Sequence, residues 1–320
     1  MRIAMIRNII CALGILLLTC NLISTAYASD VDNWPRRFEN SDSTFTTINA
    51  KPTRVLSTSV TVTGTLLAIN APVIASATTT YGHFFEQWKE VAQQREVMPL
   101  WPAGSVDIEQ AMAIQPDLII VSLSGADSAL DQINQLQQIA PTIVVDYGSM
   151  SWQELATKLG YALGIEEQVK KKIDQFNQDI AQVRSSTKLP QGMANIISYH
   201  GPGMANPIAT PDSAHGKLLT SLGFTIESPN PEWNDTATNR NNFVWSHYEN
   251  LSQLKSRTTF LLSADDSLAQ DFIADPILQN VPSVKSRRVY GLGKNSFRID
   301  YYSALEIIAG VKAHFSSSDN

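Results

Sequence analysis

A strand, a helix and a second strand follow one another in residues 54–75, Arg54-Val-Leu-Ser-Thr-Ser-Val-Thr-Val-Thr-Gly-Thr-Leu-Leu-Ala-Ile-Asn-Ala-Pro-Val-Ile-Ala75. The apolar runs at its two ends, 54–57 and 72–75, predict the strands. Between them, hydroxyl residues beginning at Ser59 can cap a helix that reaches Ala68. Two strands joined by a crossover helix lie parallel, so this stretch predicts an α/β fold.

The same alternation continues to about residue 150. Helices are expected at 107–114 and 127–139, and strands at 117–121 and 142–145. These strands are almost continuous Leu, Ile and Val, which is typical of a sheet covered on both faces. Residues 29–150, with a short hairpin near their start, therefore predict a Rossmann-like N-terminal lobe.

A long helical pattern follows this lobe. Apolar residues from Trp152 recur at helical spacing until Gly164, and a second stripe begins at Ile165 and ends near Ser185. The second helix would be about 30 Å long at roughly 1.5 Å per residue. We interpret residues 151–188 as a connecting segment whose long helix joins two lobes.

Residues 189–320 predict a C-terminal lobe of the same kind. Strands are expected at 194–199, 225–226, 260–263 and 289–292, helices at 213–222 and 302–315, and loops at 201–211 and 228–242. A helix that leads into a buried strand at 106–121 has a counterpart at 246–263, with Glu109 and Glu249 near the two helix starts. The predicted fold is two Rossmann-like lobes with mostly parallel central sheets, joined by one long α-helix, and it suggests a ligand captured in a cleft.

The N-terminus predicts export. Residues 1–28 combine Arg2 and Arg7, an apolar run and the small-residue site Ala26-Tyr-Ala28, as a cleavable signal peptide does. Both cysteines lie inside this segment, and lipidation of Cys20 is the alternative. Removal of the segment takes away two Arg and no acid, so the net charge changes from −6 to −8. This acidic balance disfavours nucleic acid and anionic membranes as partners.

Three stretches carry a family resemblance: residues 54–80, Thr210-Pro-Asp-Ser-Ala-His-Gly216 with the run that follows to 225, and Ser296-Phe-Arg-Ile-Asp-Tyr-Tyr-Ser303. The chain resembles the ferric-enterobactin periplasmic binding proteins of bacterial ABC importers, a helical-backbone (class III) family. The resemblance implies a monomeric, non-enzymatic protein of the periplasm. It would bind a ferric catecholate siderophore between its lobes and deliver it to an inner-membrane ABC permease with its ATPase.

The resemblance also assigns a docking role to one acid on each lobe. It implies that Glu109 and Glu249 meet basic pockets on the permease. The alternative is that both are solvated acids in the first turn of a helix, where the helix dipole favours negative charge.

A ferric tris-catecholate is a trianion with aromatic faces, and arginine suits it because its planar fork donates several hydrogen bonds and stacks on rings. Arg298 matches the binding arginine of the family in its sequence context; a salt bridge to Asp300 is the alternative. Arg240 lies in an Asn-rich loop and is either a second ligand contact or a solvated charge. The iron would arrive already chelated, so no resident cofactor or metal is expected.

The chain departs from the enterobactin pattern in two loops. No Arg follows Thr80, and no Trp stands in Ala205-Asn-Pro-Ile208. A related catecholate of lower charge is therefore an open alternative. Aromatic and imidazole side chains that could replace the missing groups, or simply pack in the core, are Tyr81, His83, Trp101, His200, Trp233 and Tyr301.

Other ligands and an enzyme are the competing interpretations. The same scaffold could bind another iron chelate such as a hydroxamate, haem, cobalamin or a free metal ion. The five histidines have no metal-ligand spacing. The run Gly291-Leu-Gly293-Lys-Asn-Ser296 lacks the third glycine of a dinucleotide site, and the chain has no P-loop and no Gly-x-Ser-x-Gly.

Overall fold

The first sheet consists of five parallel strands, in the spatial order β5 (Met98–Pro102), β4 (Val73–Thr78), β3 (Val55–Ser57), β6 (Leu118–Ser122) and β7 (Thr142–Val145). This is the doubly wound order, in which the direction of winding reverses between β3 and β6. The strands expected at 54–57, 72–75, 117–121 and 142–145 are confirmed. Strand β5 was not predicted because its two prolines weaken the pattern, and they are tolerated because β5 is an edge strand. The computed structural model describes residues 34–235 and 242–316.

Helix α2 (Val60–Ala68) is the buried centre of this half, since all nine of its residues are buried. It begins where expected, because the Ser59 side chain accepts a hydrogen bond from the Val62 backbone N–H. The other helices of this half are α3 (Glu86–Gln94), α4 (Ile108–Ile114), η1 (Leu130–Gln132) and α5 (Ile133–Leu136). The prediction of a helix at 127–139 is wrong for its first turn. Asp127 does not begin this helix, because its carboxyl group is hydrogen-bonded to the N-terminus of α2.

A two-stranded antiparallel hairpin, β1 (Arg36–Glu39) and β2 (Phe45–Ile48), precedes the first sheet. It confirms the hairpin expected before residue 51. The segment 1–28 and Cys20, on which the export prediction depends, lie outside the described residues. Within the described ranges, no helix is both long and apolar enough to cross a bilayer.

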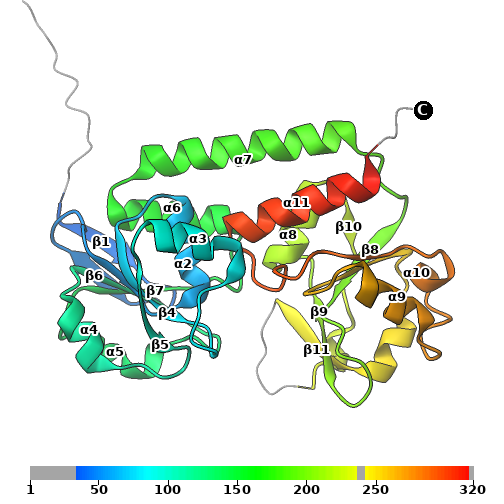
Figure 1. Ribbon diagram of the computed structural model, residues 1–320, viewed down its shortest axis with the longest axis horizontal. Helices are drawn as coiled ribbons and strands as arrows, with labels where there is room; N and C mark the ends of the chain where they lie inside the picture. Colours follow the sequence, from blue (N-terminus) through cyan, green and yellow to red (C-terminus); the bar gives the residue numbers. More distant parts are fainter. Residues whose placement is uncertain (1–33, 236–241, 317–320) are drawn as a thin grey trace, which may run out of the picture. The chain divides into compact units, whose positions relative to one another are not determined.

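Two helices connect the halves of the fold. Helix α6 (Trp152–Leu163) ends at Gly164, which is in the left-handed conformation, and α7 (Glu166–Ser186) then runs for 21 residues alongside both sheets (Figure 1). Helix α11 (Tyr301–Phe315) packs against α2, α3 and α7. Its last residue, Phe315, contacts Phe224 and Phe260 of the second half. The long helix was predicted, but the bridging role of α11 was not.

The second sheet is mixed, and its path is β11 (Phe243–His247), β9 (Ala205–Ala209), β8 (Met193–Ile197), β12 (Thr258–Leu261) and β13 (Val289–Gly291), with β10 (Thr225–Ile226) beside β8. Strand β9 pairs antiparallel with both of its neighbours, β11 and β8, and the other pairs are parallel. The loop expected at 201–211 is wrong because it contains β9. The helix expected at the start of the stretch 246–263 is found as a 3₁₀ helix, η3 (Tyr248–Gln253). It begins two residues later than expected, because β11 extends to His247.

The remaining helices of the second half are α8 (Ala214–Ser221), η2 (Pro231–Trp233), α9 (Asp266–Ala274) and α10 (Pro282–Lys285). Helix α8 and the terminal helix α11 match the expected ranges within one residue at each end. Helices α9 and α10 were not predicted. They supply the crossover between the parallel strands β12 and β13.

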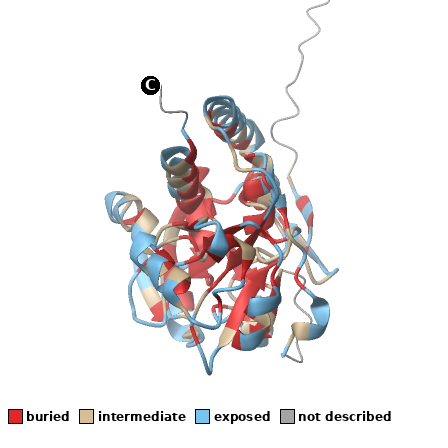
Figure 2. Ribbon diagram, turned by 90° about the vertical axis from the view of Figure 1, so that its right-hand side faces the viewer, coloured by how far each residue is buried: buried red, intermediate tan, exposed pale blue. Residues whose placement is uncertain are grey.

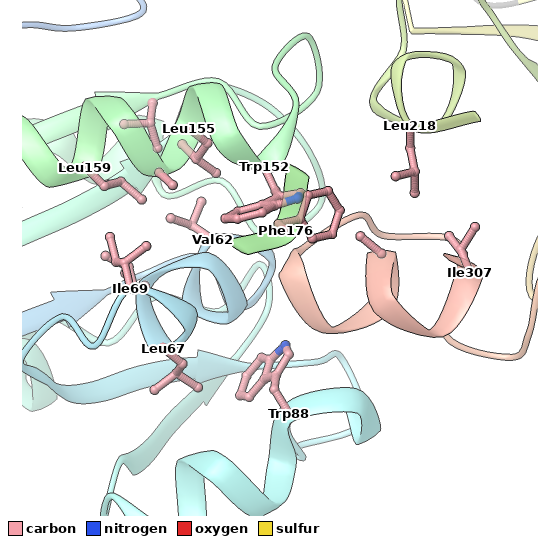
Figure 3. Close-up of a cluster of buried hydrophobic side chains, with 14 of the residues drawn as sticks. Val62, Leu67, Ile69, Trp88, Trp152, Leu155, Leu159, Phe176, Leu218 and Ile307 are labelled. Atoms are coloured by element: carbon pink, nitrogen blue, oxygen red, sulfur yellow. The ribbon is translucent and has the colours of Figure 1, made fainter. Parts of the chain in front are cut away.

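One hydrophobic core links the two sheets. It contains Leu118 of the first sheet and Phe260 of the second, with the joint between them filled by side chains of α2, α6, α7 and α11. Figure 3 shows Trp152 and Phe176 packed together at this joint. The strands are buried and the outer faces of the helices are exposed (Figure 2). Because Trp34–Asn320 is one compact unit, the domain boundaries at 28, 150 and 188 stay predictions.

Candidate ligand-binding site

A hollow lies where the carboxyl ends of the two sets of parallel strands meet. Its volume is about 560 Å³, within the range of small-molecule sites. Loops after β3, β4, β5 and β6 supply one wall, and loops after β12 and β13 supply the other; the contributing residues include Thr61, Thr79, Ala103, Asp127, Ser263 and Lys294. Ligands of open α/β sheets bind at this edge, beside the strand where the winding reverses. The fold therefore builds a binding cavity there.

Arg298 is the central cation of the cavity wall. Its guanidinium carbon lies 4.8 Å from the centre of the Phe297 ring and 5.7 Å from that of Tyr147. The guanidinium forms no hydrogen bond or ion pair with any described residue, and the salt bridge to Asp300 that was the alternative is not formed. Aromatic faces thus hold the cation while its N–H donors stay available for an anionic ligand.

Asp127 is a buried acid in the same wall, with 5% of its surface exposed. Its carboxyl oxygens accept hydrogen bonds from the Ser59 hydroxyl at 2.6 Å, the Thr61 backbone N–H at 3.0 Å and the Tyr147 hydroxyl at 2.9 Å. Burial, followed by the charge of Asp127, raises the pKa of Tyr147. Tyr147 is therefore a neutral donor at physiological pH, and the acid is satisfied from within the protein.

Lys294 is the second cation of the described wall. It is exposed, and its Nζ lies 3.4 Å from an Asp265 carboxyl oxygen, so the pair is worth little in water. Among the described lining residues, the full charges are those of Lys294, Arg298 and Asp127. The wall thus has an excess of one positive charge, which favours an anion of modest charge.

His215 lies behind this wall and contributes no charge. Burial lowers its pKa to about 4, so the ring is neutral at pH 7, and its Nε2 lies 2.9 Å from the Ser296 carbonyl oxygen. The ring packs edge-on against Phe243, which stacks on Phe297. Within residues 34–235 and 242–316, no group of three or more His, Cys, Asp or Glu side chains is arranged to hold a metal ion.

Asp300 is a fully buried acid that connects the cavity to α11. It caps α11 by accepting hydrogen bonds from the backbone N–H groups of Tyr302 and Ser303, and the cavity residue Gln87 donates to its other oxygen at 3.2 Å. A Cβ at Gly64 of α2 would lie 2.4 Å from Asp300, so only glycine allows this close approach. Burial raises the pKa of Asp300 to about 6.

The raised pKa of Asp300 predicts a pH dependence of stability. Between the ordinary value of 3.8 and about 6, the folded chain binds more protons than the unfolded chain, so stability falls as pH rises through this window. The total loss is about 3 kcal/mol for a shift of about two pKa units. In Asp300→Asn, this part of the pH dependence should disappear, because asparagine still caps the helix but does not ionise. Urea unfolding at pH 4, 5, 6 and 7 measures the difference between the two proteins.

Asp265, which caps α9, gives the matched control with the opposite sign. Hydrogen bonds from the Leu268 backbone and then from Lys294 lower its pKa, so the stability it contributes is present at neutral pH and is lost as pH falls. Asp265→Asn should therefore lose stability at pH 7 and not near pH 3. A parallel pH profile for wild type and Asp300→Asn between pH 4 and 6 would contradict the assignment of Asp300.

Residues 55–296 match the family described as periplasmic binding protein. The chain belongs to this family. The ferric enterobactin-binding periplasmic protein FepB of Escherichia coli is 38% identical over 310 residues, which cover 94% of this chain and 97% of FepB. The crystal structure of holo-ViuP is 55% identical, covers 89% of this chain and 97% of its own, and superposes with a TM-score of 0.88.

The class III fold of this periplasmic binding protein recurs at much lower identity. The triscatecholate siderophore-binding protein FeuA of Bacillus subtilis, complexed with ferri-bacillibactin, is 18% identical; the match covers 87% of this chain and 96% of FeuA, with a TM-score of 0.66. At that identity the likeness shows the fold alone. The α/β architecture with a long connecting helix, expected from the sequence, is thus confirmed.

The cavity of this periplasmic binding protein brings together Arg298, Tyr81 and His83. Tyr81 is 86% exposed at the rim, and its ring stacks on His83 with 6.2 Å between the ring centres. Arg240 lies outside the described residues. The cavity wall does not include Trp101, His200, Trp233 or Tyr301.

Three of these four predicted contacts are aromatic side chains that pack elsewhere. Trp101 of β5 is 3% exposed in a core cluster of the first half, and Trp233 packs against the core cluster of the second half. The Tyr301 ring lies against Trp152 and Phe176. Their size favours burial, which is why the sequence alone did not separate them from ligand contacts.

His200 is held by its own loop. One ring nitrogen lies 3.0 Å from the Ser198 hydroxyl, and the other lies 2.8 Å from the Ala205 carbonyl oxygen. Both nitrogens are thus engaged beside the end of β8. His200 therefore stabilises the loop between β8 and β9 and does not line the cavity.

Sequence reasoning missed Thr61, Gln87, Asp127, Lys294 and Phe297, all of which line the cavity. Three of them, Thr61, Asp127 and Lys294, come within a few residues of the end of a parallel strand. The rule that ligands bind at carboxyl ends would have selected these three positions. Gln87 had no such signal, because it lies inside α3 and reaches the cavity from the side.

Proposed function

We propose that this chain captures a ferric catecholate siderophore in the cavity and delivers it to an inner-membrane ABC permease for iron uptake. The proposal rests chiefly on Arg298. Its guanidinium faces a cavity of about 560 Å³ and has no carboxylate partner among the described residues. An anionic chelate with aromatic rings would satisfy its N–H donors and could stack on the exposed Tyr81–His83 pair. The name of FepB supports this ligand class.

The iron would enter as part of the ligand and not as a resident metal. The same proposal includes three further points. The chain is exported to the periplasm through residues 1–28, it is a monomer, and its lobes have boundaries at 150 and 188. A contact from Arg240 is also retained in it. The single excess positive charge of the described wall supports a catecholate of lower charge than three as the second candidate ligand.

Iron uptake by cells tests the proposal. Cells that lack this protein should fail to accumulate radiolabelled iron from its catecholate chelate and should keep uptake from a hydroxamate. Expression of the full-length chain should restore the catecholate uptake. Normal catecholate uptake without the protein, or restoration of only haem or hydroxamate uptake, would reject the ligand class.

Glu109 and Glu249 are proposed to dock on basic pockets of the permease. Both side chains are exposed, Glu109 in the first turn of α4 and Glu249 in the first turn of η3. Helix α4 lies on the side of the first sheet away from α7 (Figure 1). Neither residue forms an ion pair with a described side chain, so both charges are free for a partner.

Charge reversal at both positions should separate transport from binding. The double variant Glu109→Lys/Glu249→Lys is expected to lower uptake at least about tenfold, because like charges across an interface cost several kcal/mol. Its affinity for the ferric chelate should stay within about twofold, because neither residue lines the cavity.

Glu90 of α3 and Glu167 of α7 provide the control, since both are exposed acids outside the cavity wall. The variant Glu90→Lys/Glu167→Lys makes the same change in net charge and should leave uptake unchanged. If both double variants reduced uptake equally, the effect would follow from net charge, and the docking role would be rejected.

A further inference from the structure

Tyr147 lies behind Arg298 rather than in the main cavity. Its ring lines a small adjoining hollow of about 20 Å³, which it shares with Arg298 and Phe297. The guanidinium of Arg298 is therefore in contact with two aromatic rings, at 4.8 Å from Phe297 and 5.7 Å from Tyr147. The Phe297 ring in turn stacks on Phe243 of β11, with an angle of 21° between the planes.

The position of the Tyr147 ring is fixed by the first half of the fold. Its hydroxyl donates to Asp127, and Asp127 is itself held by the N-terminus of α2 through Ser59 and Thr61. A Cβ at Gly125 would lie 1.9 Å from the Tyr147 hydroxyl oxygen, and Gly125 has a φ of +102°. The loop after β6 is therefore built around this hydroxyl and leaves it little freedom.

Arg298, by contrast, belongs to the segment between β13 and α11. Among the described residues, no acceptor or carboxylate holds its guanidinium, so its orientation depends on the two aromatic faces. A flexible arginine loses much side-chain entropy when a ligand immobilises it. A tyrosine ring held in place beside the guanidinium orders the arginine before the ligand binds, so less side-chain entropy is lost on binding.

We infer that Tyr147, anchored by Asp127, is a positioning residue that holds the Arg298 guanidinium ready for the anionic ligand. The inference deepens the proposed function, on which it rests for the identity of the ligand. Tyr147 acts on the ligand only through Arg298. A carboxylate in place of the ring would also hold the arginine, but it would neutralise the charge and occupy the N–H donors that the ligand needs.

A double-mutant cycle tests the inference with ferric enterobactin as the probe. Tyr147→Leu removes the aromatic face and should weaken binding about tenfold in the wild-type background, as expected for a lost cation–π contact and a less ordered arginine. In the Arg298→Ala background, the same substitution should change the affinity less than about twofold, because coupled residues are not additive. Equal losses in both backgrounds, or no loss in either, would overturn the inference.

Tyr199 offers a matched control. Its hydroxyl donates to Asp275 at 2.6 Å, as that of Tyr147 donates to Asp127, yet it lines neither the main cavity nor the small hollow. Tyr199→Leu should leave the affinity unchanged in both backgrounds. If Tyr147→Leu does not fold, Tyr147→Gln serves in its place, since it keeps a donor for Asp127 and lacks the ring. Tyr147→Phe keeps the ring but loses its hydrogen bond to Asp127, so it should recover only part of the affinity.

A measurement on the ligand-free protein separates this inference from the proposed function. The Nε–H signal of Arg298 in nitrogen-15 NMR, assigned by its loss in Arg298→Ala, should report a more mobile side chain in Tyr147→Leu than in wild type or Tyr199→Leu. An unchanged signal would overturn the positioning role even if the chelate binds. Failure of the wild-type protein to bind ferric enterobactin would instead count against the proposed ligand, while the NMR comparison would still decide the role of Tyr147.

Discussion

Replacement of Arg298 by alanine is expected to weaken the binding of ferric enterobactin about 10- to 150-fold. Hydrogen bonds to a charged group are worth about 1.5–3 kcal/mol, and about 1.4 kcal/mol corresponds to a factor of ten in affinity. The thermal midpoint should change little, because the guanidinium forms no hydrogen bond or ion pair with a described residue. Isothermal titration calorimetry and a thermal melt of the same samples measure the two quantities.

Arg257 supplies the control for net charge. It is exposed and lies outside the cavity wall, so Arg257→Ala removes the same charge without touching the site. Its affinity should stay within about twofold of wild type at physiological salt, since the Debye length there is only about 8 Å. An Arg298→Ala protein that melts much earlier but binds with unchanged affinity would show that the residue is structural.

Replacement of Trp152 by alanine should lower the free energy of unfolding by about 3–5 kcal/mol, the usual cost of a deleted core tryptophan. Its side chain is 2% exposed, and its ring meets Phe176 at 4.8 Å and Tyr301 at 5.2 Å between ring centres. These residues belong to α6, α7 and α11, so the deletion empties the joint between the two halves. Urea unfolding at pH 7 gives the free energy.

Trp152→Phe is the control for this prediction. It retains an aromatic ring and also removes the indole N–H, which is buried without a hydrogen-bond partner. It should therefore be clearly less destabilising than Trp152→Ala. A loss below about 1 kcal/mol in Trp152→Ala would mean that the joint repacks, and it would contradict the role of Trp152 in the core.

The fold was largely predictable from the sequence wherever the apolar period and the capping residues agree with the tertiary structure. The strand–helix–strand at residues 54–75, the strand at 142–145 and the helix that ends at Gly164 follow from apolar period and capping alone. These elements are buried on several sides, so tertiary contacts reinforce the pattern instead of opposing it.

The errors lie where tertiary contacts override the local pattern. Strand β9 contains Pro207 and follows a glycine-rich turn, and both features predicted a loop. The segment forms a strand because it pairs with β11. Asp127 favours a helix start by residue type, but its carboxyl group is captured by Ser59 and Thr61 from 66 to 68 residues away. The periodicity of apolar residues carries no information about hydrogen-bond partners that lie so far apart in the sequence.

The candidate site was predictable only in part for a related reason. Arg298 was proposed from its sequence context, and Tyr81 and His83 because their loop lacks the arginine expected after Thr80; all three line the cavity. Trp101 and Tyr301 were equally plausible by residue type, yet Trp101 is buried in the core and Tyr301 packs against it, because a large ring lowers the free energy in either place. Tyr147 gave no signal, since its role depends on contacts with residues from two other loops, those after β6 and β13.

Titration of the purified, iron-free protein with ferric enterobactin, followed by intrinsic tryptophan fluorescence, tests the central claim most directly. A ferric hydroxamate and haem are titrated in parallel, and Arg298→Ala serves as the second protein. We expect saturable quenching by the catecholate, weakened in the variant, and none by the hydroxamate or haem. Saturable quenching by the hydroxamate or haem with no response to the catecholate would contradict it.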